Sequence, residues 1–373
     1  MTLPTVVPAP SPGFPKVLIK HKPDDFAVEE LPLYEPSGQG THSWFWIEKR
    51  NMNTLDAVRR LAAVLKVRSP DAGVGGLKDA KSIARQWISF EHLAPPAIEQ
   101  ALAISDTNLR VLKVSRHGNK LKMGHLRGNR FIIRLRTASG AAPSDSSLIY
   151  ERAKMALQTL ATMGIPNYYG SQRFGRSGVN VPLGEMLVRG DTGGFDKLYY
   201  ANNSGSRRPD RKLRNLYVNA FQSELFNRVA ALRMPEIGRI QAGDLAFLHR
   251  NGAVFKVPNA EDAAREQFRA DTFEISPSGP IFGAKSLLPE GIPGEIEQSV
   301  LAAAQIKLSD FGRPEAENQP GARRSLRVGF LETAGAEQDA EGVVLRFALP
   351  SGSYATIVIR EIIGDDSGAS LSE

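Results

Sequence analysis

Pro166 marks a change in the character of this sequence. Before it, segments with strand-like and helix-like periodicity alternate, whereas the stretch that begins with it, PNYYGSQRFGRSG, is rich in glycine and aromatic residues and has no clear period. Strand-like sequence returns near Arg323. A chain of 373 residues is long enough for two domains. We therefore expect an α/β (α+β) protein in which residues 1–166 and 329–373 form one domain and residues 167–328 form a second domain inserted into it.

Local patterns locate the main elements. Strands are predicted from their alternation and apolar content, over residues 26–30, 41–50 and 127–136. Helices are predicted after a cap at Asn53 or Thr54 and over residues 144–164, 211–233 and 291–306. Residues 243–257 are predicted to form a hairpin, because the Asn251-Gly252 pair is typical of a type I′ turn.

The chain is basic, with 47 Lys and Arg against 40 Asp and Glu and a formal net charge of +7. Such a balance points to a polyanionic partner, most often a nucleic acid. Cysteine is absent, which excludes a disulfide framework and cysteine metal sites. The proline-rich start lacks the apolar core of a signal peptide, and no apolar run approaches the ~18 residues of a membrane span. We expect a soluble, cytoplasmic protein that does not enter a membrane.

The positive charge is concentrated between residues 116 and 136. Seven Lys and Arg occur there without an acidic residue, which favours a surface that follows phosphates over a solvated strand edge. A second basic run, residues 207–214, lies in the expected inserted domain, so the two runs together indicate a cleft that grips a folded nucleic acid. The first run supplies the candidate RNA-binding residues, which are Arg116, Lys120, Lys122, Arg127 and Arg130.

Three glycines precede a Lys-Asp pair in GVGGLKDAKSIARQW, residues 73–87. A phosphate-binding P-loop would need Ser or Thr directly after Lys78, and a dinucleotide fingerprint would need glycine at Lys78 itself. The glycines therefore permit the close approach of a ligand to Asp79, a carboxylate suited to chemistry on a sugar. The alternative is that Asp79 caps a helix starting near Ala80, and spacing alone favours this cap.

Several other residues have both a functional and a structural interpretation. Asn129 and Phe131 point the same way on one strand, so they could read and stack on a base, or serve a turn and the core. Tyr354 follows a turn and could offer a stacking face or be an ordinary half-buried tyrosine, in a segment whose period fits strand and helix equally. No histidine pair has metal-ligand spacing. The acidic residues Asp24, Asp25, Glu29 and Glu30 could serve a glycosidase, but a solvated turn and strand edge is favoured.

The glycine segment also resembles the catalytic segment of the TruD family of tRNA pseudouridine synthases. The resemblance continues in family order over nearly the whole chain, in KPDDFAVEELPLYEPSGQGTHSWFWIEKRNMNT, RHGNKLKMGHLRGNRF, PNYYGSQRFG, NAFQSELFNRV, GDLAFLHRNGAVF, ISPSGPIFG, RRSLRV and LPSGSYAT. It implies a pseudouridine-synthase catalytic domain with a mixed sheet, interrupted by the family's inserted α/β domain. It also implies isomerisation of uridine in tRNA, typically at position 13 of the D arm.

The resemblance further implies a set of site residues. Asp79 falls on the family's catalytic aspartate, and Lys78 belongs to the same motif. Substrate-site positions around it match Lys20, Phe26, Asn129, Phe131 and Tyr354. The family often has phenylalanine at the last of these, so tyrosine keeps the ring and adds a hydroxyl.

The implied chemistry needs no metal or other cofactor. Asp79 would either attack ribose C1′ or take a proton from C2′, and the sequence does not choose between them. The implied partner is tRNA, and a monomer is expected. Two other functions stay open: a catalytically silent RNA-binding or RNA-chaperone protein on the same scaffold, and a glycoside hydrolase that pairs Asp79 with Asp24 or Asp25.

Overall fold

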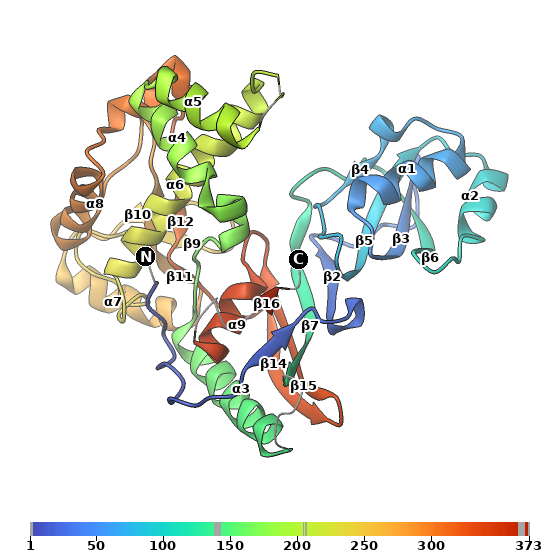
Figure 1. The fold of residues 1–373 in the computed structure, drawn as a ribbon, viewed down its shortest axis with the longest axis horizontal. Helices are drawn as coiled ribbons and strands as arrows, with labels where there is room; N and C mark the ends of the chain where they lie inside the picture. The colour runs from blue at the N-terminus through green and yellow to red at the C-terminus, as the bar shows by residue number, and fades with distance from the viewer. Residues whose placement is uncertain (1–2, 138–142, 204, 206, 365–369, 372–373) are drawn as a thin grey trace. The chain divides into compact units, whose positions relative to one another are not determined.

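The computed structural model describes residues 3–137, 143–203, 205, 207–364 and 370–371. The chain forms two compact units. The first, here called the sheet unit, comprises Ala9–Gln158, Phe330–Ala355 and Arg360–Glu373. The second, here called the central unit, comprises Met1–Pro8, Thr159–Gly329 and Thr356–Ile359. Both contain helices and strands, so the expected α/β class is confirmed (Figure 1).

One mixed sheet of ten described strands organises the sheet unit. Its main path runs in the order β14-β15-β7-β2-β5-β3-β6, with β1, β4 and β16 paired beside it. The bounds are β1 Val17–Ile19, β2 Phe26–Pro32, β3 His42–Arg50, β4 Gly73–Val74, β5 Ile83–Glu91, β6 Leu109–His117, β7 Leu126–Thr137, β14 Glu332–Asp339, β15 Gly342–Pro350 and β16 Ser370–Leu371. The pair β2–β5 is parallel, whereas β2–β7, β7–β15 and β3–β5 are antiparallel.

Register assigns the side chains of the central strands to two faces. Val28 of β2 lies opposite Phe131 of β7, and Glu30 lies opposite Asn129, so these four side chains share one face. Glu29 lies opposite Arg130 and, in β5, Arg85, so these side chains share the other face. The first of these faces contributes to the candidate site.

Helices cover part of the sheet. The bounds are α1 Thr54–Leu65, α2 Pro95–Leu102, α3 Pro143–Met163 and α9 Ala355–Ile363. Asn53 caps α1 through its side chain, and the buried stripe of α1, which includes Leu61 and Leu65, packs with Phe45 and Ile47 of β3. The ambiguous segment around Tyr354 is thus a helix, α9.

The central unit has its own helices and small sheets. Its helices are α4 Asn180–Arg189, α5 Thr192–Asn202, α6 Arg211–Leu232, α7 Ala260–Asp271 and α8 Gly291–Ala303. A sheet in the order β10-β9-β11-β12 comprises β9 Leu245–Leu248, β10 Val254–Lys256, β11 Ile275–Ile281 and β12 Ala322–Ser325. A separate pair joins β8 Ile165–Pro166 and β13 Arg327–Val328.

The predicted hairpin is confirmed as β9–β10, but its predicted type I′ turn is wrong. That turn needs positive φ at both Asn251 and Gly252, and only Gly252 has it, at +75°. The Leu248 N–H donates to the Ala253 carbonyl at 2.8 Å, so four residues rather than two connect the strands. A connection of this length no longer requires the mirror-image turn.

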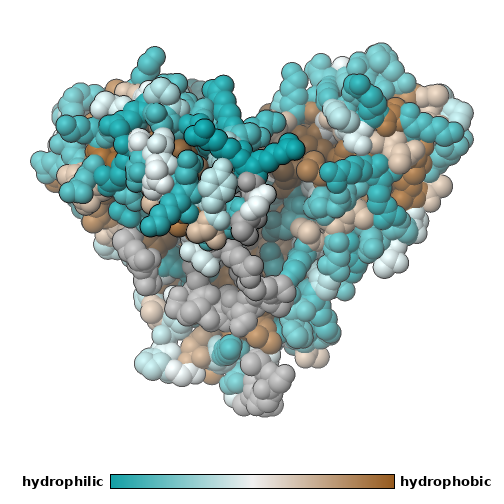
Figure 2. All heavy atoms as spheres, turned by 45° about the horizontal axis from the view of Figure 1, so that its top comes forward, coloured by the Kyte–Doolittle hydropathy of each residue, from teal (hydrophilic) through white to brown (hydrophobic). Residues whose placement is uncertain are grey.

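The surface in Figure 2 is mostly hydrophilic, with apolar residues in small patches. Among the helices that the structure describes, none has the length and apolar content to cross a bilayer.

Candidate active site

The glycine segment forms a loop between β4 and β5. Residues 75–82 have neither helix nor strand structure, and β5 begins at Ile83. Asp79 lies in this loop with its side chain 54% exposed. No helix begins near Ala80, so the interpretation of Asp79 as a helix cap is wrong. Its carbonyl accepts a hydrogen bond from the Ser82 hydroxyl at 3.0 Å, which keeps the loop compact.

The glycines serve packing within the chain rather than backbone reversal. None of the three has a positive φ. A Cβ atom on Gly73 would lie 2.2 Å from the Leu121 carbonyl oxygen, and one on Gly75 would lie 3.0 Å from Glu30 Oε1. The Gly75 carbonyl also accepts the Gly124 N–H at 2.9 Å. The loop therefore packs directly against residues 118–125 and against Glu30, which the expectation of ligand approach did not anticipate.

A lysine stands beside the exposed carboxylate. Lys20 Nζ lies 3.3 Å from Asp79 Oδ2 and 4.2 Å from the centroid of the Phe26 ring. The Lys20 side chain is only 17% exposed, so its ammonium is largely withdrawn from water. A cation held in this way stabilises negative charge on Asp79. Three of the predicted site residues are thus brought together.

A buried ion pair lies behind the loop. Lys78 Nζ is 3.4 Å from Glu30 Oε2 and donates a hydrogen bond of 2.6 Å to Asn129 Oδ1. Glu30 is fully buried, and burial raises its pKa while the Lys78 charge opposes the rise. Burial likewise lowers the pKa of Lys78, which the Glu30 charge opposes. The interpretation of Glu30 as part of a solvated strand edge is therefore wrong.

Asn129 is part of β7 rather than of a turn, and its amide nitrogen makes no hydrogen bond to another described residue. Phe131 is buried at 7% exposure, with ring centroids 6.1 Å from Phe26 and 5.5 Å from Phe347. Core packing therefore accounts for Phe131, and its role on a base stays a prediction. Asn129 leaves an amide donor for a ligand.

Tyr354 is the residue before α9, with extended backbone and a half-buried side chain that makes no capping hydrogen bond. It follows the end of β15, whose Leu349 lies opposite Asn129 in the sheet. The Ser351 N–H donates to the Arg127 carbonyl at 3.0 Å, which ties this turn to the start of β7. The sheet thus brings Tyr354 toward the end of β7 that carries Asn129.

Sequence reasoning missed three residues that hold the loop backbone. The Thr54 hydroxyl accepts the Lys78 N–H at 2.8 Å and donates to Gln86 Oε1 at 2.9 Å, and Gln86 Nε2 donates to the Gly76 carbonyl at 3.4 Å. Lys49 Nζ donates to the carbonyls of Met52 at 2.6 Å and Asp79 at 2.7 Å. A signal for Lys49 was available, because alternation places it on the same side of β3 as Phe45 and Ile47, where a charged residue is unexpected.

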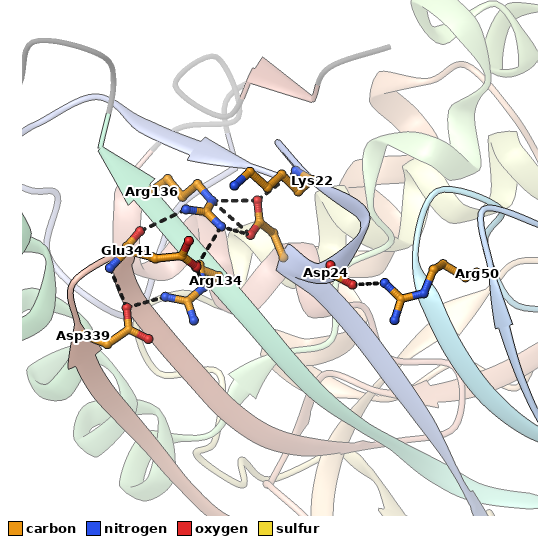
Figure 3. Close-up of polar contacts among 8 residues, drawn as sticks. Lys22, Asp24, Arg50, Arg134, Arg136, Asp339 and Glu341 are labelled. Atoms are coloured by element: carbon orange, nitrogen blue, oxygen red, sulfur yellow. Dashed lines mark hydrogen bonds and ion pairs between the residues drawn. The ribbon is translucent and has the colours of Figure 1, made fainter. Parts of the chain in front are cut away.

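The positive charges of residues 116–136 separate into two groups. Arg130 contacts Glu29 and Glu332, each at 2.6 Å. Arg134 pairs with Asp339, and Arg136 makes a two-pronged contact with the buried Asp25, so the interpretation of Asp25 as a solvated turn residue is wrong (Figure 3). The acidic partners that the segment lacks are thus supplied by other strands. The remaining members make no ion pair with a described residue; they are Arg116, Lys120, Lys122 and Arg127.

Neither carboxylate proposed for a glycosidase pairs with Asp79. Asp24 contacts Arg50, and Asp25 contacts Arg136 (Figure 3). Within the described residues there is also no group of three or more His, Cys, Asp or Glu that could hold a metal ion. What the site presents is one exposed carboxylate, a neighbouring ammonium and a buried polar network.

A solved structure shares the fold of this chain. The crystal structure of a Methanosarcina mazei protein described as a putative tRNA pseudouridine synthase D (TruD) matches it with a TM-score of 0.76. The match covers 97% of this chain and 96% of that chain at 22% sequence identity, which shows a shared fold.

Sequence comparisons identify the family. The family model described as tRNA pseudouridine synthase D (TruD) matches residues 12–212 and 206–362. A protein of Geobacter metallireducens named tRNA pseudouridine synthase D is 39% identical, over 92% of this chain and 94% of its own. One of the same name from Anaeromyxobacter sp. is 40% identical, over 95% and 94%. This chain belongs to the TruD family of tRNA pseudouridine synthases, which confirms the resemblance seen in the sequence.

Proposed function

We propose that this protein isomerises uridine 13 in the D arm of tRNA to pseudouridine, with Asp79 as the catalytic group. Family membership supports the reaction class, because relatives that match over most of their length are named tRNA pseudouridine synthase D. The observation that carries the role of Asp79 is its geometry. It is an exposed carboxylate 3.3 Å from the Lys20 ammonium, on a loop whose backbone is held by buried side chains.

The reaction asks for a carboxylate and a way to hold a detached base. The bond between ribose C1′ and N1 breaks, the base turns, and C5 bonds to C1′, with the C5 proton lost and N1 protonated. An ionised Asp79 can attack C1′ or remove the C2′ proton, and the Lys20 ammonium lies 3.3 Å from its Oδ2 atom. The Asn129 amide donor and the ring of Tyr354 are suited to keep the base in place.

The proposal is tested with tRNA transcripts that carry tritium at C5 of uridine. Formation of the C1′–C5 bond releases that tritium to water, so release measures isomerisation directly. We expect release equivalent to one uridine per transcript, and none from a transcript with cytidine at position 13. Tritium release that persists with the cytidine transcript would refute uridine 13 as the modified nucleotide. No release from either transcript would favour the alternative of a catalytically silent RNA-binding protein.

The four residues without ion pairs predict how tRNA is held. We expect tRNA affinity to fall steeply with salt, because each neutralised phosphate releases counterions. Lys122→Ala or Arg127→Ala should make the log–log slope shallower by about one unit. Arg134→Ala is the matched control, since Arg134 already pairs with Asp339, and it should leave the slope unchanged. An equal effect of all three variants, or a wild-type slope near zero, would contradict this assignment.

Tyr354 offers a prediction that separates stacking from packing. If the ring stacks on the uracil, Tyr354→Phe should be near wild type, and Tyr354→Leu should lose turnover by an amount corresponding to ~1–3 kcal/mol. Packing alone predicts that Tyr354→Ala lowers stability by ~3–5 kcal/mol and that Tyr354→Leu recovers much of both stability and turnover. Thermal melting and single-turnover rates of these variants decide between the two. A Leu variant with near-normal turnover would remove Tyr354 from the site.

Three further expectations stay proposals. We infer that residues 1–166 and 329–373 form the catalytic domain and 167–328 the inserted one, because the candidate site residues, from Lys20 to Tyr354, all fall within the sheet unit. A monomer and a cytoplasmic location are likewise inferred, from the function rather than from contacts. The runner-up function, an RNA-binding protein without catalysis, shares the basic surface but gives Asp79 no task.

A further inference from the structure

We propose that Lys49 is a positioning residue that fixes the backbone of Asp79 for the reaction. The proposal rests on the proposed catalytic role of Asp79. Lys49 lies on β3, in a sequence block that resembles the family, but its motif spacing does not indicate a function. The contacts of its side chain indicate one.

The burial of Lys49 is unusual for a lysine. Its side chain is fully buried, and it makes no ion pair with any carboxylate that the structure describes. Its ammonium instead donates to two main-chain carbonyls, of Met52 at 2.6 Å and of Asp79 at 2.7 Å. Buried lysines are rare unless paired with a carboxylate, because the charged form loses its hydration. A chain that only needed to fill this space would be better served by an apolar side chain.

The two carbonyls belong to different connections. Met52 lies between β3 and α1, and Asp79 lies between β4 and β5, so one ammonium joins both. The Asp79 side chain is exposed, and its carboxylate lies 3.3 Å from the Lys20 ammonium. The orientation of the Asp79 carboxylate therefore depends on where the Asp79 backbone is held. Displacement of a reacting group by about 1 Å can cost ~10²-fold in rate.

Lys49 also places a positive charge beneath the carboxylate. Burial lowers the pKa of Lys49 to about 8, while the negative charge of Asp79 opposes this shift and the neighbouring Lys78 charge adds to it. As the pH rises through about 8, Lys49 loses its proton and the charge that holds the Asp79 carbonyl disappears. We expect the single-turnover rate to decline in that range. Lys78 faces the same loop, and burial lowers its pKa as well.

The test compares Lys49→Met with the wild type and with the control variant Lys113→Met. Lys113 is a lysine of β6 on the other side of the sheet, where its ammonium lies 5.2 Å from the centroid of the Trp87 ring. Lys49→Met should lower the single-turnover rate by about tenfold or more, with tRNA affinity changed by less than about threefold. Its alkaline decline near pH 8 should vanish. Lys113→Met should keep the wild-type rate and pH profile.

A chemical rescue separates positioning from folding. The chain has no cysteine, so in Lys49→Cys the thiolate is the only one that can displace bromide from 2-bromoethylamine, in urea before refolding. The product carries an ammonium at nearly the length of lysine. Lys49→Cys should be slow, and aminoethylation should restore the rate to within about threefold of the wild type.

Each outcome bears on the proposal. A normal rate in Lys49→Met, or a loss fully explained by the unfolded fraction of the variant, would overturn it. An alkaline decline that persists in Lys49→Met would assign the titration to another group and overturn the role of the Lys49 charge. Failure of the proposed function is distinguishable, because in that case the wild type would release no tritium, or Asp79→Asn would retain turnover.

Discussion

Asp79→Asn is expected to abolish pseudouridine formation while changing tRNA affinity by less than about threefold. The amide is nearly the same size as the carboxylate, so the loop can keep its backbone contacts to Lys49, Thr54 and Ser82. It carries no negative charge, however, and can neither attack C1′ nor take a proton from C2′ at a useful rate. Because the side chain is 54% exposed, and a carboxylate does not attract a phosphate, we expect neither folding nor binding to depend on it.

The matched control for this variant is Asp24→Asn. Asp24 is another exposed carboxylate of the sheet unit, and its partner is Arg50 rather than the loop. It should keep wild-type turnover, which would also remove the glycosidase alternative. Tritium release measures turnover and filter binding measures affinity. Turnover above about 1% of wild type in purified Asp79→Asn, or a parallel loss in Asp24→Asn, would take the catalytic role away from Asp79.

Lys78→Met is expected to have the largest effect on stability. It leaves the carboxylate of Glu30 fully buried without its cation, and breaking a buried pair from one side typically costs ~3–5 kcal/mol. Turnover should fall as well, because Asn129 loses the donor that orients its amide. The double variant Glu30→Leu/Lys78→Met should recover most of the stability, since neither charge is then buried alone, but not the turnover.

The pH dependence of this variant follows from the pKa of Glu30. Burial already raises that pKa in the wild type, and loss of the Lys78 charge raises it further. A carboxyl whose folded pKa exceeds its unfolded pKa destabilises the fold increasingly as the pH rises above the unfolded value, and fully once the pH passes the folded value. The stability deficit of Lys78→Met should therefore shrink toward acid pH. Melting curves at pH 5 and pH 8 measure it, and a deficit that is equal at both values would contradict a buried, uncompensated Glu30.

The local elements of this fold were largely predictable, because they follow from nearby residues. Period-two alternation indicated β2, β3 and β7, and a capping Asn53 indicated α1. The type of turn at Asn251-Gly252 was not predictable, since turn type depends on where the paired strands end. The proposed role of Asp79 rests on a family resemblance, because its spacing alone favoured a helix cap that the structure does not contain.

The polar environment of the site could not be predicted from local sequence. Arg130 pairs with Glu332, 202 positions away, so a basic residue in a segment without acidic residues is still paired in the fold. Glu30 looks like a solvated strand residue until β5 and β7 bury it against Lys78. These contacts are set by strand order and register, which a local pattern does not determine.

The most direct test of the proposed function is to map pseudouridine in an unmodified tRNA transcript after incubation with equal amounts of wild-type protein and Asp79→Asn. Carbodiimide labelling followed by primer extension locates each pseudouridine along the transcript. We expect one new stop, which locates a pseudouridine at position 13, with the wild type and none with Asp79→Asn. A wild-type protein that binds the transcript but produces no pseudouridine, or an Asp79→Asn protein that produces the same stop, would contradict it.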